Sequence, residues 1–286
     1  MKRTTITCVA ILVAGLPFTV HATAFAGAGL FRSSVNGGIL DAGVDTRSIS
    51  PFLRTAQQAT GIGQQPADTN TLIKQLKSAS ADERRDAIQQ LGETKDAQAL
   101  QPLIGVLSDK EADMRAAALN ALGTLGDKGA VEPVTGMLKD PIEFVRAAAA
   151  RVLGQISDPG ADTALLGALN DSSSSVQSAA ALSLGQLKDE AAAPSLMKLL
   201  KASGSDVRAA AAGALGMLKE KAAVTALVSL LNDEDDTVKV AAAFALGDIG
   251  DKQALPALKD AVSSQKDPDV RTRLEEALQH LTASAE

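Results

Sequence analysis

Apolar residues recur along most of the chain with a period of 31 residues. The period is marked by Leu-Gly pairs at Leu91-Gly92, Leu122-Gly123, Leu153-Gly154, Leu184-Gly185, Leu215-Gly216 and Leu246-Gly247. Alanine lies four positions before each leucine, and in five units Met or Val lies eight before it and Leu or Ile three after it. These positions share one side of a helix. Each unit is therefore predicted to contain an amphipathic helix, called helix B.

A second apolar pattern precedes helix B in the units. Its pairs are Leu103 and Leu107, Val134 and Leu138, Leu165 and Leu169, Leu196 and Leu200, and Leu227 and Leu231. A spacing of four residues again indicates a helix, called helix A. In the turn Asp140-Pro141-Ile142-Glu143, Asp140 is predicted to cap helix B and Pro141 to begin it. Each unit is thus predicted to be a pair of antiparallel helices.

Stacking of these units is required because one helix pair cannot bury its own apolar face. The sequence predicts an all-α, right-handed α-solenoid of the ARM/HEAT type over residues 68–286, with about seven two-helix repeats and atypical capping repeats at both ends. Each glycine within helix B costs about 1 kcal/mol relative to alanine. Its recurrence after the leucine therefore predicts a close contact between successive units.

Residues 1–26 have the layout of a secretory signal peptide. Lys2 and Arg3 precede an apolar run over residues 6–20, and Ala-x-Ala sites follow at residues 22–24 and 24–26. The run is interrupted by Pro17 and is shorter than the roughly 20 residues that a spanning helix needs. We expect cleavage, a periplasmic or secreted protein, and no membrane insertion after cleavage. Cys8, the only cysteine, would be lost with the peptide.

Residues 27–67 show no repeat and are rich in Gly, Ser, Asn and Gln. This composition predicts a flexible segment. Ser50 and Pro51 are helix start signals and Gly61 is a stop signal, so one short helix is expected near residues 51–60.

Charge and side-chain inventory exclude several function classes. The formal net charge is −6, which disfavours nucleic acid as a partner. The two histidines, His21 and His280, are too few for a histidine metal site or a histidine-activated nucleophile. The acidic turn at residues 233–236 lacks the alternating spacing of a calcium loop, so a solvated turn is the favoured interpretation. We expect no catalytic residue, cofactor or metal, and no enzyme activity.

The pattern LxxxL, a turn Asp and then VRxAAAxALG resembles HEAT repeats of the short type named after the phycobilisome (PBS) lyases, over about residues 68–282. The resemblance implies a structural ladder in which a turn Asp meets an Arg six residues later. Its matching residues are Asp109 and Arg115, Asp140 and Arg146, and, less well, Asp171 and Gln177, and Asp233 and Lys239. Arg84 and Arg208 lack an Asp six positions earlier, so the ladder is expected to be patchy. An anion-binding stripe is the alternative role for these arginines.

The face of helix B opposite the core stripe becomes apolar in the later units. Its residues are Leu182, Gly213, Met217, Val240 and Phe244. Stacking is expected to align Leu182, Gly213 and Phe244 in a row, with a dip at Gly213. Helix B is expected to line the concave side of the solenoid, so this row is a candidate groove for an extended or helical peptide. Packing between units, or against residues 27–67, is the alternative.

These observations predict an exported, monomeric scaffold or adaptor that binds another protein or peptide. The resemblance leaves a second interpretation open, namely an accessory enzyme or a chromophore-handling or cofactor-handling protein related to the bilin lyases or the hydroxylases of the same repeat family. The repeated His-Glu pairs that hold metal in those hydroxylases have no counterpart in this sequence. A purely structural spacer of the cell envelope is the third interpretation.

Overall fold

The computed structural model describes residues 5–10, 18–23, 32–35, 38–39 and 68–284, and the chain divides into two units, residues 1–65 and 66–286. The described part of the first unit is an antiparallel sheet of order β1-β2-β3-β4. Its strands are β1 (Thr5–Ala10), β2 (Phe18–Thr23), β3 (Arg32–Val35) and β4 (Gly38–Ile39). Cys8 pairs with Val20, Ala22 with Ser33, and Ser34 with Ile39.

The sequence analysis did not predict these strands. β1 reads TITCVA and is rich in β-branched residues, which favour strands. β3 and β4 lie inside the segment expected to be flexible, whereas the short helix expected near residues 51–60 lies outside the described residues. The signal peptide stays a prediction.

The second unit is a succession of helix pairs, and its described residues contain no strand. The first helices of the pairs are α2 (Thr69–Gln75), α4 (Leu100–Val106), α6 (Val131–Gly136), α8 (Asp162–Ala168), α10 (Ala193–Leu199), α12 (Val224–Leu230) and α14 (Leu255–Ser264). The second helices are α3 (Ala81–Glu93), α5 (Ala112–Leu125), α7 (Glu143–Ile156), α9 (Ser174–Leu187), α11 (Ser205–Met217), α13 (Asp236–Ile249) and α15 (Pro268–Ser284). The predicted all-helical solenoid of two-helix repeats is confirmed.

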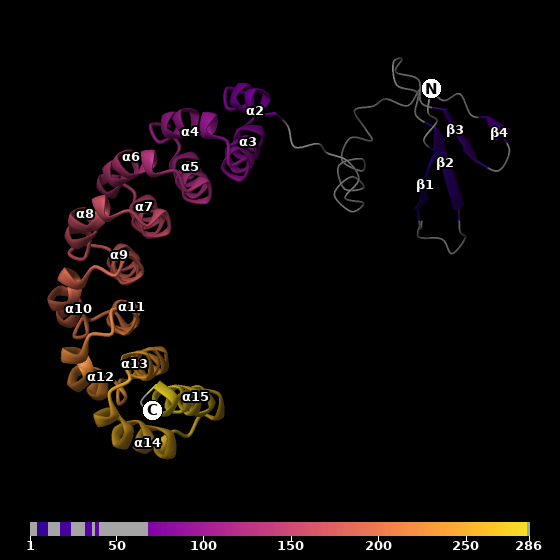
Figure 1. Ribbon diagram of the computed structural model, residues 1–286. Coiled ribbons are helices and arrows are strands. Elements are labelled where there is room, and N and C mark those ends of the chain that lie inside the picture. The colour runs from indigo at the N-terminus through magenta and orange to yellow at the C-terminus, as the bar shows by residue number, and fades with distance from the viewer. Residues whose placement is uncertain (1–4, 11–17, 24–31, 36–37, 40–67, 285–286) are drawn as a thin grey trace. The chain divides into compact units, whose positions relative to one another are not determined.

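The two helix sets form two layers of a curved stack. In Figure 1 the first helices, from α2 to α14, lie along the outer side of the arc, and the second helices, from α3 to α15, lie along its inner side. Each second helix packs against the second helices before and after it and against the first helix of its own pair. The concave surface of this unit is therefore made of second helices.

The core lies between the two layers and is built from leucine, valine and alanine. Leu103, Leu165, Leu184 and Leu215 are fully buried, as are the alanines that precede each Leu-Gly pair by four positions. Apolar residues at helical spacing thus pack against those of neighbouring helices in every repeat. A single helix pair could not bury these residues by itself.

The recurrent glycines stand where neighbouring second helices approach most closely. A Cβ atom built on Gly92 would lie 2.7 Å from the Cα atom of Ala121, and one built on Gly185 would lie 2.8 Å from the Cα atom of Ala214. Real Cβ atoms do not approach other atoms so closely, so a larger residue would push the helices apart. The close contact predicted from the glycine recurrence is present.

Candidate interaction surface

The inner surface over α9, α11 and α13 carries small and apolar side chains. Leu182 on α9 is 38 % exposed and Met217 at the end of α11 is 41 % exposed. Gly213, Val240 and Phe244 are half-buried, and Phe244 packs partly against the core. We call these five residues the apolar patch. The structure thus exposes Leu182 and Met217, whereas Phe244 combines exposure with internal packing.

The members of the patch meet across the junction between α9 and α11. A Cβ atom built on Gly213 would lie 3.8 Å from the Cδ2 atom of Leu182, with no other neighbouring atom within 4 Å. One built on Gly185 would lie 3.2 Å from the Sδ atom of Met217. Leu182 of α9 thus lies beside Gly213 of α11, and Met217 of α11 lies beside Gly185 of α9, so apolar side chains of the two helices adjoin at this junction.

Polar and charged side chains border the patch at both ends. At the position equivalent to Leu182, α5 carries Asn120 and α7 carries Arg151, and the guanidinium of Arg151 donates to the side-chain oxygen of Asn120 at 2.9 Å. On the other side, Asp248 at the end of α13 lies 3.6 Å from the imidazole of His280 on α15. At this position of the second helices the side chain is thus polar on α5 and α7, whereas α9 and α13 carry large apolar residues and α11 carries glycine.

Two further exposed apolar side chains were not singled out from the sequence. Ile142 is 38 % exposed and Phe144 is 46 % exposed, and both lie where the chain enters α7. Phe144 lies nine positions before Leu153, outside the repeating apolar positions of helix B, so the sequence pattern did not identify it.

The arginines form a ladder, but its register differs from the expected one. The side chain of Arg115 pairs with Asp140 of the next repeat at 2.7 and 2.8 Å, and contacts Asp109 only through that residue's carbonyl oxygen at 2.9 Å. Arg146 pairs with Asp171 in the same way, and Arg208 pairs with Asp233. The expected pairing of each Arg with the Asp six residues earlier is therefore wrong, because the partner carboxylate lies 25 residues later.

The turn aspartates also order the chain before each second helix. Asp140 accepts a hydrogen bond from the backbone N–H of Ile142 at 2.9 Å, and α7 begins at Glu143 without a side-chain cap. The predicted cap by Asp140 and helix start at Pro141 are corrected by this geometry. The carboxylate holds the turn and bridges to Arg115, so one side chain joins two repeats.

Two positions of the ladder are not occupied by an arginine. Gln177 donates to the carbonyl oxygen of Asp171 at 2.7 Å, and the residue 25 positions later is Ala202, so both members of this rung are replaced. Lys239 bonds to Asp236 within its own helix at 2.7 Å. At the first junction Arg84 pairs with Glu111 at 3.1 Å instead of Asp109. The ladder is thus interrupted between α9 and α11.

The arginines of the ladder are not available to bind anions. Arg115 and Arg208 are 9 % and 8 % exposed, and each donates to a carboxylate and to backbone carbonyls. Hydrogen bonds from Arg146 lower the pKa of Asp171, and those from Arg208 lower the pKa of Asp233. These rungs are charged at neutral pH and serve the stacking of repeats.

The acidic turn at residues 233–236 has structural contacts as well. Asp233 belongs to a rung, Asp235 accepts from the backbone N–H of Thr237 at 2.8 Å, and Asp236 pairs with Lys239. Within the described part of the chain, no three His, Cys, Asp or Glu side chains are grouped so that they could hold a metal ion. Among the described helices none combines the length and apolarity needed to cross a membrane.

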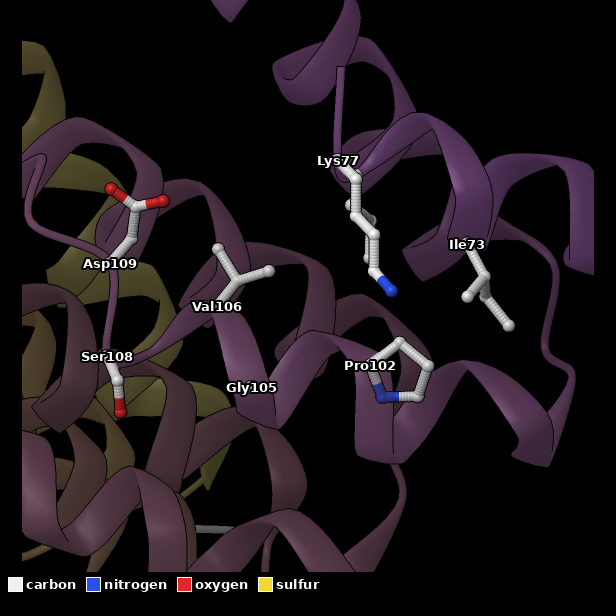
Figure 2. A pocket seen from close by; sticks show the side chains of 8 residues that line it. Ile73, Lys77, Pro102, Gly105, Val106, Ser108 and Asp109 are labelled. Atoms are coloured by element: carbon white, nitrogen blue, oxygen red, sulfur yellow. The ribbon is translucent and has the colours of Figure 1, made fainter. Parts of the chain in front are cut away.

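A separate hollow of about 440 Å³ lies on the outer layer between α2 and α4 (Figure 2). Ile73 of α2 and Lys77, just after that helix, line one side of it, and Pro102 and Gly105 of α4 line the other. No sequence signal predicted this hollow, because it results from the spacing of two first helices that are not adjacent in the chain.

Comparison with known proteins identifies the repeat. The HEAT-repeat family matches residues 69–149, 138–216 and 194–279. None of the curated proteins compared with the chain matches it.

Several solved structures are similar to this chain. The complex of CpcE and CpcF of phycocyanin lyase from Nostoc sp. PCC7120 is 26% identical, with 74% of this chain and 94% of that chain covered and a TM-score of 0.52. Human deoxyhypusine hydroxylase is 25% identical, with 81% and 90% covered and a TM-score of 0.39. Kap121p is 20% identical, with 71% and 25% covered and a TM-score of 0.56. From its repeats, its two-layered stack and the match of the family over residues 69–279, the chain belongs to the HEAT-repeat family.

Proposed function

We propose that this HEAT-repeat protein is a scaffold or adaptor that binds another protein or peptide through the concave surface of its second helices. The observation that carries the proposal is the exposure of Leu182 and Met217 on adjacent inner helices. Large apolar side chains that are exposed to water on neighbouring helices are typical of interaction sites. Stacked repeats offer such a surface over a long, curved area.

The chemistry of this surface favours binding over catalysis. The five residues of the apolar patch have no titratable or nucleophilic group, and α9 has no charged residue at all. The ladder charges are engaged between repeats. Recognition by apolar contact, with charges only at the border, is what this arrangement can provide.

We further propose that the protein is exported and acts as a monomer without a cofactor. The basic start, apolar run and Ala-x-Ala sites of residues 1–26 support export. The net acidic charge supports a protein partner over nucleic acid. N-terminal sequencing of the protein isolated from its own cells measures the cleavage: we expect a mature start at residue 25 or 27, and an earlier start or an uncleaved chain contradicts the proposal.

A second candidate function, the handling of a chromophore, is favoured by the similarity to the complex of CpcE and CpcF of phycocyanin lyase. Under this alternative the protein would bind a bilin or assist its attachment. The absorption spectrum of the purified protein separates the two candidates. The scaffold proposal predicts that the purified protein has no absorption above the ultraviolet and retains none after incubation with bilin and removal of the free pigment, and a retained chromophore would favour the alternative.

The scaffold proposal is tested by cross-linking from a residue on the inner surface. A photoreactive amino acid replaces Leu182, and in a matched control it replaces Asn120, which holds the equivalent position on α5. In the protein's own cells, we expect position 182 to yield one dominant protein adduct and position 120 to yield much less. No adduct at position 182, or equal adducts at both positions, contradicts the proposal.

A further inference from the structure

Gly213 is not explained by the packing of the solenoid. Glycine inside a helix is less favourable than alanine, so it needs a reason. Gly216, one turn later on α11, has one, because a Cβ atom there would lie 2.7 Å from the Cα atom of Ala245. At Gly213 the built Cβ atom meets only Leu182, at the ordinary contact distance of 3.8 Å. The neighbouring helices would accept a side chain here, yet the position is left open.

Large apolar side chains surround this open space. Leu182 and Phe244 occupy the equivalent positions on α9 and α13, one repeat before and one repeat after Gly213. Met217 follows Gly213 by one turn of α11 and is exposed. Gly213, which has no side chain, thus lies between large apolar side chains at the equivalent positions of the two neighbouring helices, and this arrangement suits a large apolar side chain from outside.

The border of the patch carries opposite charges at its two ends. Arg151 stands at the equivalent position on α7, two repeats before Gly213, and it is exposed. On the far side, Asp248 is half-buried and Glu276 on α15 is exposed. A partner that crosses the surface thus meets a cation first, then neutral apolar side chains, then carboxylates.

We propose that the apolar patch binds an extended peptide segment that places one large apolar side chain in the open space above Gly213, an acidic residue beside Arg151 and a basic residue beside Asp248 and Glu276. This proposal rests on the proposed function and names its partner's chemistry. Apolar anchoring supplies affinity, and the charges at the border select the partner and its direction.

The curvature of the surface favours an extended segment. Neighbouring packed helices are about 8–10 Å apart, so α7 and α15 are separated by roughly 32–40 Å along the stack. An extended chain advances about 3.3 Å per residue and covers that span with about eleven residues. It can follow the concave arc seen in Figure 1, whereas a straight helix of the same span would touch only part of it. The acidic and basic residues should each lie about five residues from the anchor.

The test uses synthetic peptides and the full chain. The probes are labelled peptides of about eleven residues with Asp, Phe and Lys at this spacing, made in both directions, and matched peptides with Ala for Phe. We expect one direction to bind at least ten-fold more tightly than its Ala counterpart, as measured by fluorescence anisotropy. Equal affinity for the Phe and Ala peptides overturns the proposal.

Filling the open space provides the matched variant. Gly213→Leu should weaken binding of the Phe peptide at least ten-fold, while the melting temperature does not fall. Gly167→Leu is the control, because Gly167 on the outer helix α8 also has open space around it and lies off the inner surface. Arg151→Glu should lower the affinity for the peptide that carries Asp and raise the affinity for a peptide that carries Lys at the position of this Asp. Unchanged binding by both Gly213→Leu and Arg151→Glu overturns the proposal.

The outcomes separate this inference from the proposed function. If cross-linking at position 182 captures a partner but Gly213→Leu still binds it with unchanged affinity, the scaffold function stands and the anchoring model fails. If position 182 captures nothing, the proposed function itself fails. Analytical ultracentrifugation of the unsubstituted protein tests whether a second copy of the chain occupies the patch. A dimer that dissociates on Gly213→Leu would assign the patch to a second copy and overturn the peptide proposal.

Discussion

Single glycines on the inner helices serve two different purposes. Gly185 lies against the backbone of the next helix, where a Cβ atom would approach the Cα atom of Ala214 to 2.8 Å, whereas a Cβ atom at Gly213 would make only an ordinary contact of 3.8 Å with Leu182. The same residue type therefore sets the distance between repeats at one position and the shape of the inner surface at the other.

Alanine substitutions should distinguish these two purposes. Gly185→Ala forces two helices apart and is expected to lower the free energy of unfolding by about 1–3 kcal/mol. Gly213→Ala meets no close neighbour and is expected to raise it by up to about 1 kcal/mol through helix propensity. Urea unfolding followed by circular dichroism measures both. A loss of stability in Gly213→Ala, or no loss in Gly185→Ala, would show that the glycines have been assigned wrongly.

The pairing of Asp140 with Arg115 in the ladder predicts how the stability of the protein depends on pH. Burial alone would raise the pKa of Asp140, but hydrogen bonds from Arg115 and the N–H of Ile142 outweigh it, so the pKa is lowered. The stabilising effect is therefore fully present above the usual carboxyl pKa and is lost as pH falls through the lowered folded-state value.

Asp140→Asn removes this effect and leaves Arg115 without its anion. We expect a loss of about 2–4 kcal/mol at neutral pH, with a smaller loss in strong acid, because there the unchanged protein has also lost the charge. Unfolding free energies measured from pH 7 down to pH 2 check both parts. A loss that stays constant over that range would contradict the charged rung.

At the scale of elements, the junction between α9 and α11 differs from its neighbours. Side-chain hydrogen bonds link the repeats through Arg115 and Asp140, Arg146 and Asp171, and Arg208 and Asp233. Among the described residues, the rung between α9 and α11 has Gln177 and Ala202 instead. This junction is held by apolar contacts, and it is also the one that Leu182 and Gly213 border.

Restoring the missing rung should stabilise this junction. In the pair Gln177→Arg and Ala202→Asp, each single substitution adds a charge without its partner, whereas the double substitution recreates the pairing found one repeat earlier. We expect the double variant to be about 1–2 kcal/mol more stable than the sum of the single effects. A double-mutant cycle from urea unfolding measures this coupling, and additive effects would contradict the inter-repeat register.

The helices could be predicted from the sequence because the spacing of apolar residues is a property of one element. Contacts between elements could be predicted only in part. The glycine after Leu184 indicated a close approach because it is costly and recurrent. The partner of Arg115 could not be read in the same way, since Asp109 is near it in sequence and Asp140 becomes near only once repeats stack. Helix spacing placed Phe244 on the outer face, but neighbouring helices half-bury it. The hollow between α2 and α4 and the strands β1 to β4 had no signal that was recognised.

At the scale of the whole molecule, the helical unit separates stability from recognition. The first helices and the facing sides of the second helices form the core, and the ladder joins the turns, so the inner surface is free to vary. Its last helix, α15, buries Leu274, Ala277 and Leu281 and exposes charged side chains on the other side, which suits the end of a stack. Under the proposed function, the change along the inner surface from polar to apolar side chains determines where a partner binds.

The most direct test of this account compares two pairs of equally exposed apolar residues. Leu182→Ser with Met217→Ser alters the inner surface, and Ile142→Ser with Phe144→Ser alters the entry to α7 as a control. The measurement is the amount of the cross-linked partner that each variant retains when purified from its own cells, with melting temperatures compared in parallel. The account predicts at least a ten-fold loss for the first pair and little change for the second. Equal retention by both pairs, or a loss confined to the second, would contradict it.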